Sequence, residues 1–538
     1  MKLNKYMKRG FILMTFLVAI SSCETLELSD EQLTSPNNPS LDVADPDLLL
    51  NSVILNFENF LDQINNQQME FARMESLFGA YTGQFAMTPA SLDNDWGFAY
   101  SSTLQDSKTL KEVATNRELT AYVAIAQLIE AYTYVTLVDT WGKVPFSEAL
   151  LGAANANPNP EDGQVIYDAI YNLIDEALAE LNTAVSSTPV PDDLFYGGDV
   201  NKWIKLGNTL KLKMYHQSRL VNQGTSATEI TSLVNSGNLI LSSDEDFQFE
   251  YSSVVTPADS RHPKYIANYT SSGAGDYMSN YYMNLLKDDK STEDPRLRYY
   301  IYRQIDEDPE GDFLPCASSA YPFCYIGDFY WGRDHGDSFG VPNDPLQRST
   351  WGLYPVGGAF DNDAFLDVTK NPGTGGAGIL PIMTSSFVNF ILAESALTLG
   401  TPGNARTYLE NGVRESMNKV LNFNTGEVDP AFAATDDDVN DYVAEVLSLY
   451  DAAGSDTERL DVISKEYLLA LFGNGIEAYN NYRKTGLPSD IQDPVINAGE
   501  FPRSYFYPPA ATNNNNNISQ KPVTEQVFWD NNPSGFIN

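Results

Sequence analysis

The chain has 538 residues, and 42% of them are hydrophobic, which is enough to build a large folded core. Its 72 acidic residues outnumber its 33 basic residues, so the net charge at pH 7 is −39. An excess of negative charge this large repels phosphate backbones, and it excludes nucleic-acid binding as a function. Most of the acidic residues are expected to keep a solvated surface soluble.

The N-terminus has the pattern of a secretory signal peptide over residues 1–22, with basic residues before an apolar run from Phe11 to Ile20. A run of about ten residues is too short to span a hydrocarbon core of about 30 Å as a helix. The stretch Ala19 to Cys23 resembles a bacterial lipobox, which implies that Cys23 is acylated after cleavage. Two or more acyl chains hold a protein stably on a membrane, so residues 23–45 are expected to form a lipid-attached tether.

Helical patterns dominate the chain after the tether. Residues 45–64 carry one apolar face, and Asp45 with Pro46 is a typical helix start. A second helix is predicted over residues 69–86, followed by an irregular stretch from Thr88 to Ser102.

The next predicted helix begins after Thr115 and Glu118, which have the spacing of a capping box. It is apolar nearly all round until Gly142 and Pro145 end it. A helix with no polar face has to be buried on several sides.

Four further helices are predicted, and two of them are separated by a short turn. Small residues stand where these two helices would cross, at Ala396, Gly400 and Ala405, a pattern similar to a tetratricopeptide repeat. Several such pairs in sequence predict a scaffold of stacked helical hairpins. The four helices cover residues 163–184, 201–221, 386–400 and 404–417.

The pattern changes between about residues 240 and 382, where glycine, proline, tyrosine and aspartate are frequent and helical periodicity fails. A structureless loop of that length is unusual in a compact domain, so short strands, turns and small helices are expected there. The run Asn513 to Asn517 is predicted to be a flexible surface loop.

Cys316 and Cys324 remain once Cys23 is acylated, and the chain has left the reducing cytoplasm. We expect a disulfide between them. Two free buried thiols are the alternative, and a metal pair is less favoured because no histidine stands at ligand spacing nearby.

The sequence "WGRDHGDSFG" contains a G-x-S-x-G motif around Ser338 with His335 upstream, the residue types of a serine hydrolase. A nucleophile elbow needs a helix after the serine, and Pro342 and Pro345 prevent one. Catalysis by Ser338 is therefore not expected. The acidic stretch from Asp306 begins like an EF-hand loop, but Ala317 stands where a bidentate glutamate is required, so neither a metal nor another cofactor is expected.

Aromatic rings outside the predicted helices suit sugar recognition, because a sugar offers a face of C–H bonds and a rim of hydroxyl groups. Polar neighbours stand beside two of these rings. The sequence leaves open whether each ring binds ligand or fills the core of the irregular region, and we expect one or two to be exposed. The ligand-binding candidates are Asn94, Asp95, Trp96, Tyr100, Trp331, Arg333, His335, Trp351 and Tyr354.

Three helical segments, together with the lipobox and the tail sequence "QVFWD", resemble the SusD/RagB family of nutrient-binding outer-membrane lipoproteins. The resemblance runs from Cys23 almost to the end of the chain. It implies a mainly α-helical domain over residues 46–538, with tetratricopeptide-like hairpins packed against an irregular ligand-binding half. The three segments are Tyr132–Leu150, Asp199–Leu220 and Tyr467–Pro488.

The family also implies a lipid-anchored protein on the cell surface that binds a nutrient and passes it to a SusC-like TonB-dependent transporter. We expect non-catalytic capture of a glycan, and peptide capture is the variant that the sequence does not separate from it. A surface glycosidase with an acidic pair stays open, because the diagnostic distance between two carboxylates lies in space and not in sequence. A structural lid or adhesin without a soluble ligand is the third hypothesis.

Overall fold

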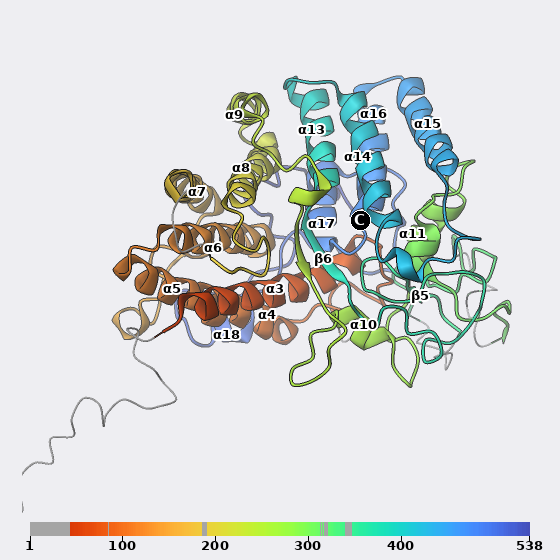
Figure 1. The fold of residues 1–538 in the computed structure, drawn as a ribbon, viewed down its shortest axis with the longest axis horizontal. Helices are drawn as coiled ribbons and strands as arrows, with labels where there is room; N and C mark the ends of the chain where they lie inside the picture. The colour runs from red at the N-terminus through yellow and green to blue at the C-terminus, as the bar shows by residue number, and fades with distance from the viewer. Residues whose placement is uncertain are drawn as a thin grey trace, which may run out of the picture. The chain divides into compact units, whose positions relative to one another are not determined.

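The structure is a computed structural model that describes residues 44–83, 86–184, 191–311, 314, 316, 321–338 and 347–538. The predicted signal peptide, the predicted acylation of Cys23 and nearly all of the predicted tether lie outside these residues. The chain from Pro46 to Asn538 forms one compact unit. Within this unit, helices make up the scaffold and the few strands are short (Figure 1).

The first helix, α3 (Pro46–Phe71), begins at the predicted proline and buries its predicted apolar face. The second helix predicted over residues 69–86 is wrong. After Phe71 the backbone turns at Arg73, whose φ is +61° and whose guanidinium donates to the carbonyls of Phe71 and Gln492. A partner more than four hundred positions away in the sequence therefore decides where this helical segment stops.

Residues 89–116, which we call the helical run, are helical almost throughout, contrary to the predicted irregular stretch. Thr88 forms a capping box with Ser91, and Pro89 occupies the first helical position, so the start of the run is well satisfied. The run consists of η2 (Pro89–Leu92), α4 (Asp93–Gly97), the π-helical η3 (Phe98–Thr103) and α5 (Leu104–Asn116).

The apolar helix α6 (Thr120–Trp141) lies in the core, as its lack of a polar face predicts. It is long and apolar enough to cross a membrane by length and composition, but 83% of its most apolar window is buried inside the unit. The predicted capping box is wrong, because α5 continues through Thr115 and the N-cap of α6 is Leu119, which makes no side-chain cap bond.

The remaining long helices pair as hairpins. α6 packs along α7, and α13 packs along α14 across the predicted turn, where Gly400 caps α13 in the left-handed conformation. In Figure 1, α13, α14, α16 and α15 stand side by side. These helices are α7 (Gly163–Ala184), α8 (Val200–Gln217), α9 (Gln223–Ser236), α13 (Ser385–Leu399), α14 (Ala405–Leu421), α15 (Asp436–Ala452), α16 (Asp456–Ala470) and α17 (Gly475–Thr485).

The irregular region between about residues 240 and 382 contains short strands, turns and small helices, as predicted. Its two ends are joined by an antiparallel pair, β3 (Phe247–Glu250) with β6 (Ile379–Met383), in which Phe249 faces Leu380. This pair anchors the base of the region on the helical scaffold. Within it lie α10 (Pro263–Asn268), α11 (Asn280–Lys287), α12 (Leu297–Tyr300), and β4 (Ile301–Tyr302) paired with β5 (Thr350–Trp351).

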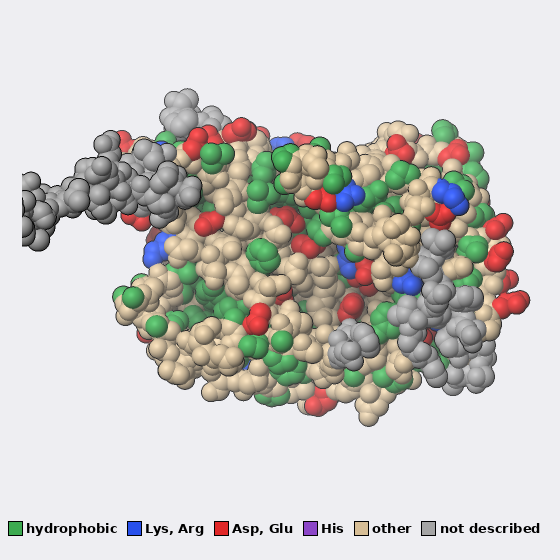
Figure 2. Space-filling view, turned by 90° about the horizontal axis from the view of Figure 1, so that it is seen from below, with side chains coloured by type: hydrophobic (Ala, Val, Ile, Leu, Met, Phe, Trp, Pro, Cys, Tyr) green, Lys and Arg blue, Asp and Glu red, His purple; other side chains and the backbone are tan. Residues whose placement is uncertain are grey.

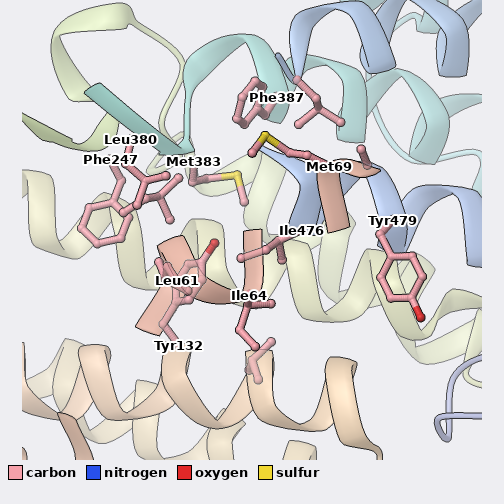
Figure 3. Close-up of a cluster of buried hydrophobic side chains, with 14 of the residues drawn as sticks. Leu61, Ile64, Met69, Tyr132, Phe247, Leu380, Met383, Phe387, Ile476 and Tyr479 are labelled. Carbon is pink, nitrogen blue, oxygen red and sulfur yellow. The ribbon is translucent and has the colours of Figure 1, made fainter. Parts of the chain in front are cut away.

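The core gathers side chains from the beginning, middle and end of the chain around β6 (Figure 3). Each large apolar side chain that is removed from water contributes about 1.5–3 kcal/mol to folding before entropy is counted. This shared core joins the helical hairpins to the base of the irregular region. Its labelled members are Leu61, Ile64 and Met69 of α3, Tyr132 of α6, Phe247, Leu380, Met383, Phe387, Ile476 and Tyr479.

Several other short elements connect the long helices, and four of them follow α6 or lie in the C-terminal segment. A two-stranded sheet follows α6 directly, and a short helix lies in the C-terminal segment. These elements are β1 (Val144–Pro145), β2 (Pro160–Glu161), η4 (Gly152–Ala154) and α18 (Pro509–Thr512).

Candidate functional site

A groove of about 470 Å³ opens where three separate segments meet, and it lies within the size range of small-molecule sites. We call it the Trp96 groove. The helical run supplies the first wall, with Trp96, Tyr100, Ser101 and Gln105. The loops around η4 supply the second, with Pro145, Ala149, Leu150, Gly152, Ala156 and Pro158. The C-terminal segment supplies the third, with Ala510, Ala511, Asn514, Asn515 and Ile518.

Two aromatic rings lie together on the first wall. Trp96 and Tyr100 are four positions apart, which places them on the same side of the helical run. Their ring centroids are 4.8 Å apart, and the edge of Trp141 supports Trp96 from behind at 5.4 Å. The Tyr100 hydroxyl donates to the carbonyl of Pro145 over 2.7 Å, which fixes the ring against the second wall.

The indole N–H of Trp96 distinguishes it from the other tryptophans. Trp96 is 8% exposed and lines the groove, and its N–H has no hydrogen-bond partner among the described residues. A buried or half-buried indole normally finds an acceptor. The other five indoles do so: Trp141 donates to Phe506, Trp203 to Asp193, Trp331 to Glu307, Trp351 to Glu75 and Trp529 to Asp139.

The third wall is held in place by amide side chains from the predicted flexible asparagine run. Asn515 is buried and donates to the carbonyl of Pro158 over 2.7 Å, while Asn517 donates to the carbonyl of Asn157 over 2.7 Å. In return, the side chain of Asn157 accepts from the backbone of Asn516 over 2.8 Å. The run is therefore fixed to the second wall and is not a free loop.

Asn94 and Asp95 precede Trp96 but do not line the groove, because successive residues of α4 point in different directions. Asn94 is exposed, whereas Asp95 is 5% exposed. Burial raises the pKa of Asp95 from 3.8 to about 7. The sequence pattern of polar residues beside Trp96 therefore indicated a ring that lines the groove, but its two polar neighbours do not line the groove.

Trp331, Arg333 and His335 lie buried inside the irregular region, and the structure does not bring them to the Trp96 groove. The Arg333 guanidinium lies over the ring of Tyr277 at 4.9 Å. The ring of His335 lies 3.2 Å from the Tyr81 hydroxyl, and burial together with Arg73 lowers its pKa well below 6.5. His335 is therefore neutral, and neither of its ring nitrogens hydrogen-bonds Ser338, because Nε2 pairs with Tyr81 and Nδ1 has no partner among the described residues.

Trp351 and Tyr354 are also buried, at 0% and 2% exposure, and they do not line that groove either. The indole of Trp351 donates to the Glu75 carboxylate over 2.9 Å, and Tyr354 packs against Phe423 at 5.4 Å. Both rings hold the irregular region on the helical scaffold. Of the nine candidates, the structure brings Trp96 and Tyr100 to one groove.

Cys316 and Cys324 form a disulfide, with their Cα atoms 5.6 Å apart. The backbone N–H of Cys324 donates to Asp334 over 2.7 Å, so the bridge is tied to the "GRDHG" turn. Within the described ranges, no three His, Cys, Asp or Glu side chains are grouped as metal ligands, and Ala317 of the EF-hand-like stretch lies outside those ranges.

The fold and the groove define a mainly helical protein with an open surface groove whose described lining carries no Asp, Glu, Lys, Arg or His. The model of a family described as "Starch-binding associating with outer membrane" matches residues 36–320, and that of the family "Susd and RagB outer membrane lipoprotein" matches residues 363–522. The first match covers more than half of the chain. The chain therefore belongs to the SusD/RagB family of outer membrane lipoproteins, which are generally non-catalytic binding proteins of the bacterial surface.

Solved structures show the same fold at low sequence identity. A chitin-binding protein is 20% identical with a TM-score of 0.66, and the match covers 91% of this chain and 100% of that one. A chitin-binding SusD homolog from Flavobacterium johnsoniae is 17% identical, with a TM-score of 0.61 and coverage of 92% and 97%. A SusD/RagB family protein from Bacteroides thetaiotaomicron is 17% identical, with a TM-score of 0.68 and coverage of 91% and 100%. No curated protein gives a significant match.

Proposed function

We propose that this protein captures a glycan in the Trp96 groove and delivers it, chemically unchanged, to a SusC-like TonB-dependent transporter. The observation that carries the proposal is that Trp96 lines the groove and that its indole N–H has no hydrogen-bond partner among the described residues. Beside it, the ring of Tyr100 extends the aromatic surface. A sugar ring stacks on such a surface and accepts a hydrogen bond from such a donor.

The walls add the polar groups that a glycan needs. Exposed Gln105 and Asn514 bring side-chain amides, which donate and accept, as sugar hydroxyl groups do. Family membership supports carbohydrate as the ligand class, and the chitin-binding structural neighbours support it further. The outer membrane location follows from the family, and we assign the anchor to acylated Cys23.

The test is a matched pair of tryptophan variants. Trp96→Phe keeps a ring in the groove and removes the free N–H, so glycan affinity is expected to fall by about tenfold with little change in stability. Trp331→Phe removes an N–H that the protein itself uses, so it is expected to lower stability and leave affinity unchanged. Calorimetry of both variants against starch, cellulose and chitin oligosaccharides measures the affinity.

Two results would contradict the proposal. Binding that Trp96→Phe leaves unchanged would place the ligand elsewhere. Release of shorter products from any bound oligosaccharide, abolished by a single carboxylate-to-amide substitution, would make the protein a glycosidase. Cys23→Ala, with radiolabelled palmitate as the probe, tests the anchor separately, because this variant should lose both the label and membrane association.

A further inference from the structure

We infer that the Trp96 groove selects uncharged glycans and rejects acidic ones such as uronic acid polymers. This inference rests on the proposed function and adds the ligand class to it. One residue in five of the chain is charged, so about three of the fifteen described lining residues would be expected to be charged. None of those fifteen carries an ionisable acid or base other than the Tyr100 phenol.

The polar groups that line the groove are neutral. Ser101, Gln105 and Asn514 supply a hydroxyl and two amides, and Trp96 supplies its N–H. Amides and hydroxyl groups match the sugar hydroxyl, which donates and accepts at the same oxygen. A carboxylate or sulfate accepts only, and it is bound strongly by arginine or lysine, which the described lining lacks.

Charged side chains also stand near the groove, outside its described lining. Lys108, a cation beside the second wall, donates to the carbonyl of Leu150 over 2.6 Å. Asp93 and Glu148 stand behind the walls as acceptors for Ala510 and Asn159. The hydrogen bond from the Asn159 backbone lowers the pKa of Glu148, so this carboxylate is charged at neutral pH.

The field of the whole protein acts in the same direction. A net charge of −39 repels an anionic polymer before contact, and it leaves a neutral one unaffected. The face seen from below, to which α3, α10 and α18 contribute, is largely hydrophobic or uncharged, with acidic and basic side chains scattered across it (Figure 2). The described lining of the groove carries no lysine or arginine, and Lys108 stands beside it.

The experiment uses pairs of polymers that share one backbone and differ in charge. Hydroxyethyl starch is compared with carboxymethyl starch, and hydroxyethyl cellulose with carboxymethyl cellulose, by affinity electrophoresis and calorimetry of the full chain. For a backbone that binds, the neutral form is expected to bind at least about tenfold tighter at 20 mM NaCl. The difference narrows at 500 mM NaCl because salt screens the repulsion.

A lysine introduced at an exposed lining residue of the groove tests the charge selectivity further. Gln105 is exposed on α5, so Gln105→Lys adds a cation to the groove without disturbing the core. This variant is expected to bind the carboxymethyl polymer several-fold more tightly at 20 mM NaCl than Gln105→Met, which loses the same amide without gaining a charge. Gln105→Met is the control, because it has a similar size and no charge.

The outcomes separate the two proposals. Carboxymethyl polymers that bind as tightly as their neutral partners would overturn the selectivity while leaving glycan capture intact. Absence of binding by every polymer, or binding that is insensitive to Trp96→Phe, would instead overturn the proposed function itself. Both proposals are supported by three results together. The neutral polymer binds more tightly than the carboxymethyl polymer, Trp96→Phe weakens that binding, and Gln105→Lys reduces the difference in affinity between the two polymers.

Discussion

The helical run and the irregular region are both rich in aromatic rings, but they use the rings differently. In the helical run, Trp96 keeps its indole N–H free of the described residues and lines a groove. In the irregular region, the indole N–H groups of Trp331 and Trp351 donate to Glu307 and Glu75. A ring is available to a ligand when the protein has not already used its polar edge.

The backbone explains the difference. A helix satisfies its own N–H and C=O groups, so its side chains are free to face outward. The irregular region has only short helices and strands, and side chains also hold its segments together. Lys264, for example, lies 2.6 Å from Glu75 and also bonds Asp276. Rings and charges that look like ligand contacts in its sequence are used as internal ties.

Removing one such tie is expected to have the largest effect on folding. Lys264→Met leaves the buried Glu75 and the half-buried Asp276 without their cation, which costs about 3–5 kcal/mol of unfolding free energy. Their charges, which outweigh burial, raise the pKa of Lys264, so the lysine is charged at neutral pH. Urea denaturation measures the loss. A loss below about 1 kcal/mol would mean that the irregular region does not depend on this cluster.

Asp95 offers the contrasting buried carboxylate, behind the groove and without a cation. Its folded pKa of about 7 lies above the ordinary 3.8, so the protein loses stability as pH rises through this interval. Asp95→Asn removes that loss, and it should stabilise the protein relative to wild type by up to about 4 kcal/mol at pH 8 and hardly at pH 4. Thermal unfolding at both pH values checks the sign, and an equal difference at both would refute it.

Trp351→Phe removes an indole hydrogen bond inside the irregular region, and it is expected to cost less stability than Lys264→Met. The ring is retained while the N–H bond to Glu75 is lost, so about 1–3 kcal/mol of stability is expected to disappear. Glycan affinity per folded molecule should not change. A weaker affinity at full folding would show that the irregular region contributes to the site.

The smallest expected effect concerns the third wall of the groove. Asn515→Ala removes the bond to Pro158 and should cost about 1 kcal/mol locally, with faster hydrogen exchange over residues 513–517. Glycan affinity should fall by a few-fold because the wall loosens. Asn513, which is exposed, provides the control, since Asn513→Ala should change neither exchange nor affinity.

Local patterns predicted the scaffold well. The helix predicted over residues 163–184 has the bounds of α7, and the small residues around Gly400 predicted the α13–α14 hairpin. The failures follow from distant partners. Arg73 ends the first helical segment through Gln492, and β3 pairs with β6 across more than a hundred residues. No local period encodes such contacts.

The site was predictable in part. The four-residue spacing of Trp96 and Tyr100 indicated a shared helical face once the stretch was known to be helical, and the missed signal was the capping sequence from Thr88 to Ser91. Ser101, Gln105 and Asn514 carry no pattern that marks them as lining residues. Their proximity depends on how three remote segments meet.

Because the groove is built from distant segments of the chain, its formation comes late in protein synthesis. The third wall lies about 400 residues after Trp96, so the ribosome synthesises nearly the whole polypeptide before the glycan-binding groove can form. The same C-terminal segment carries Trp529, which is fully buried and donates to Asp139 of α6. Proteolysis before residue 510 would therefore remove part of the core together with the third wall, so capture and stability would be lost together.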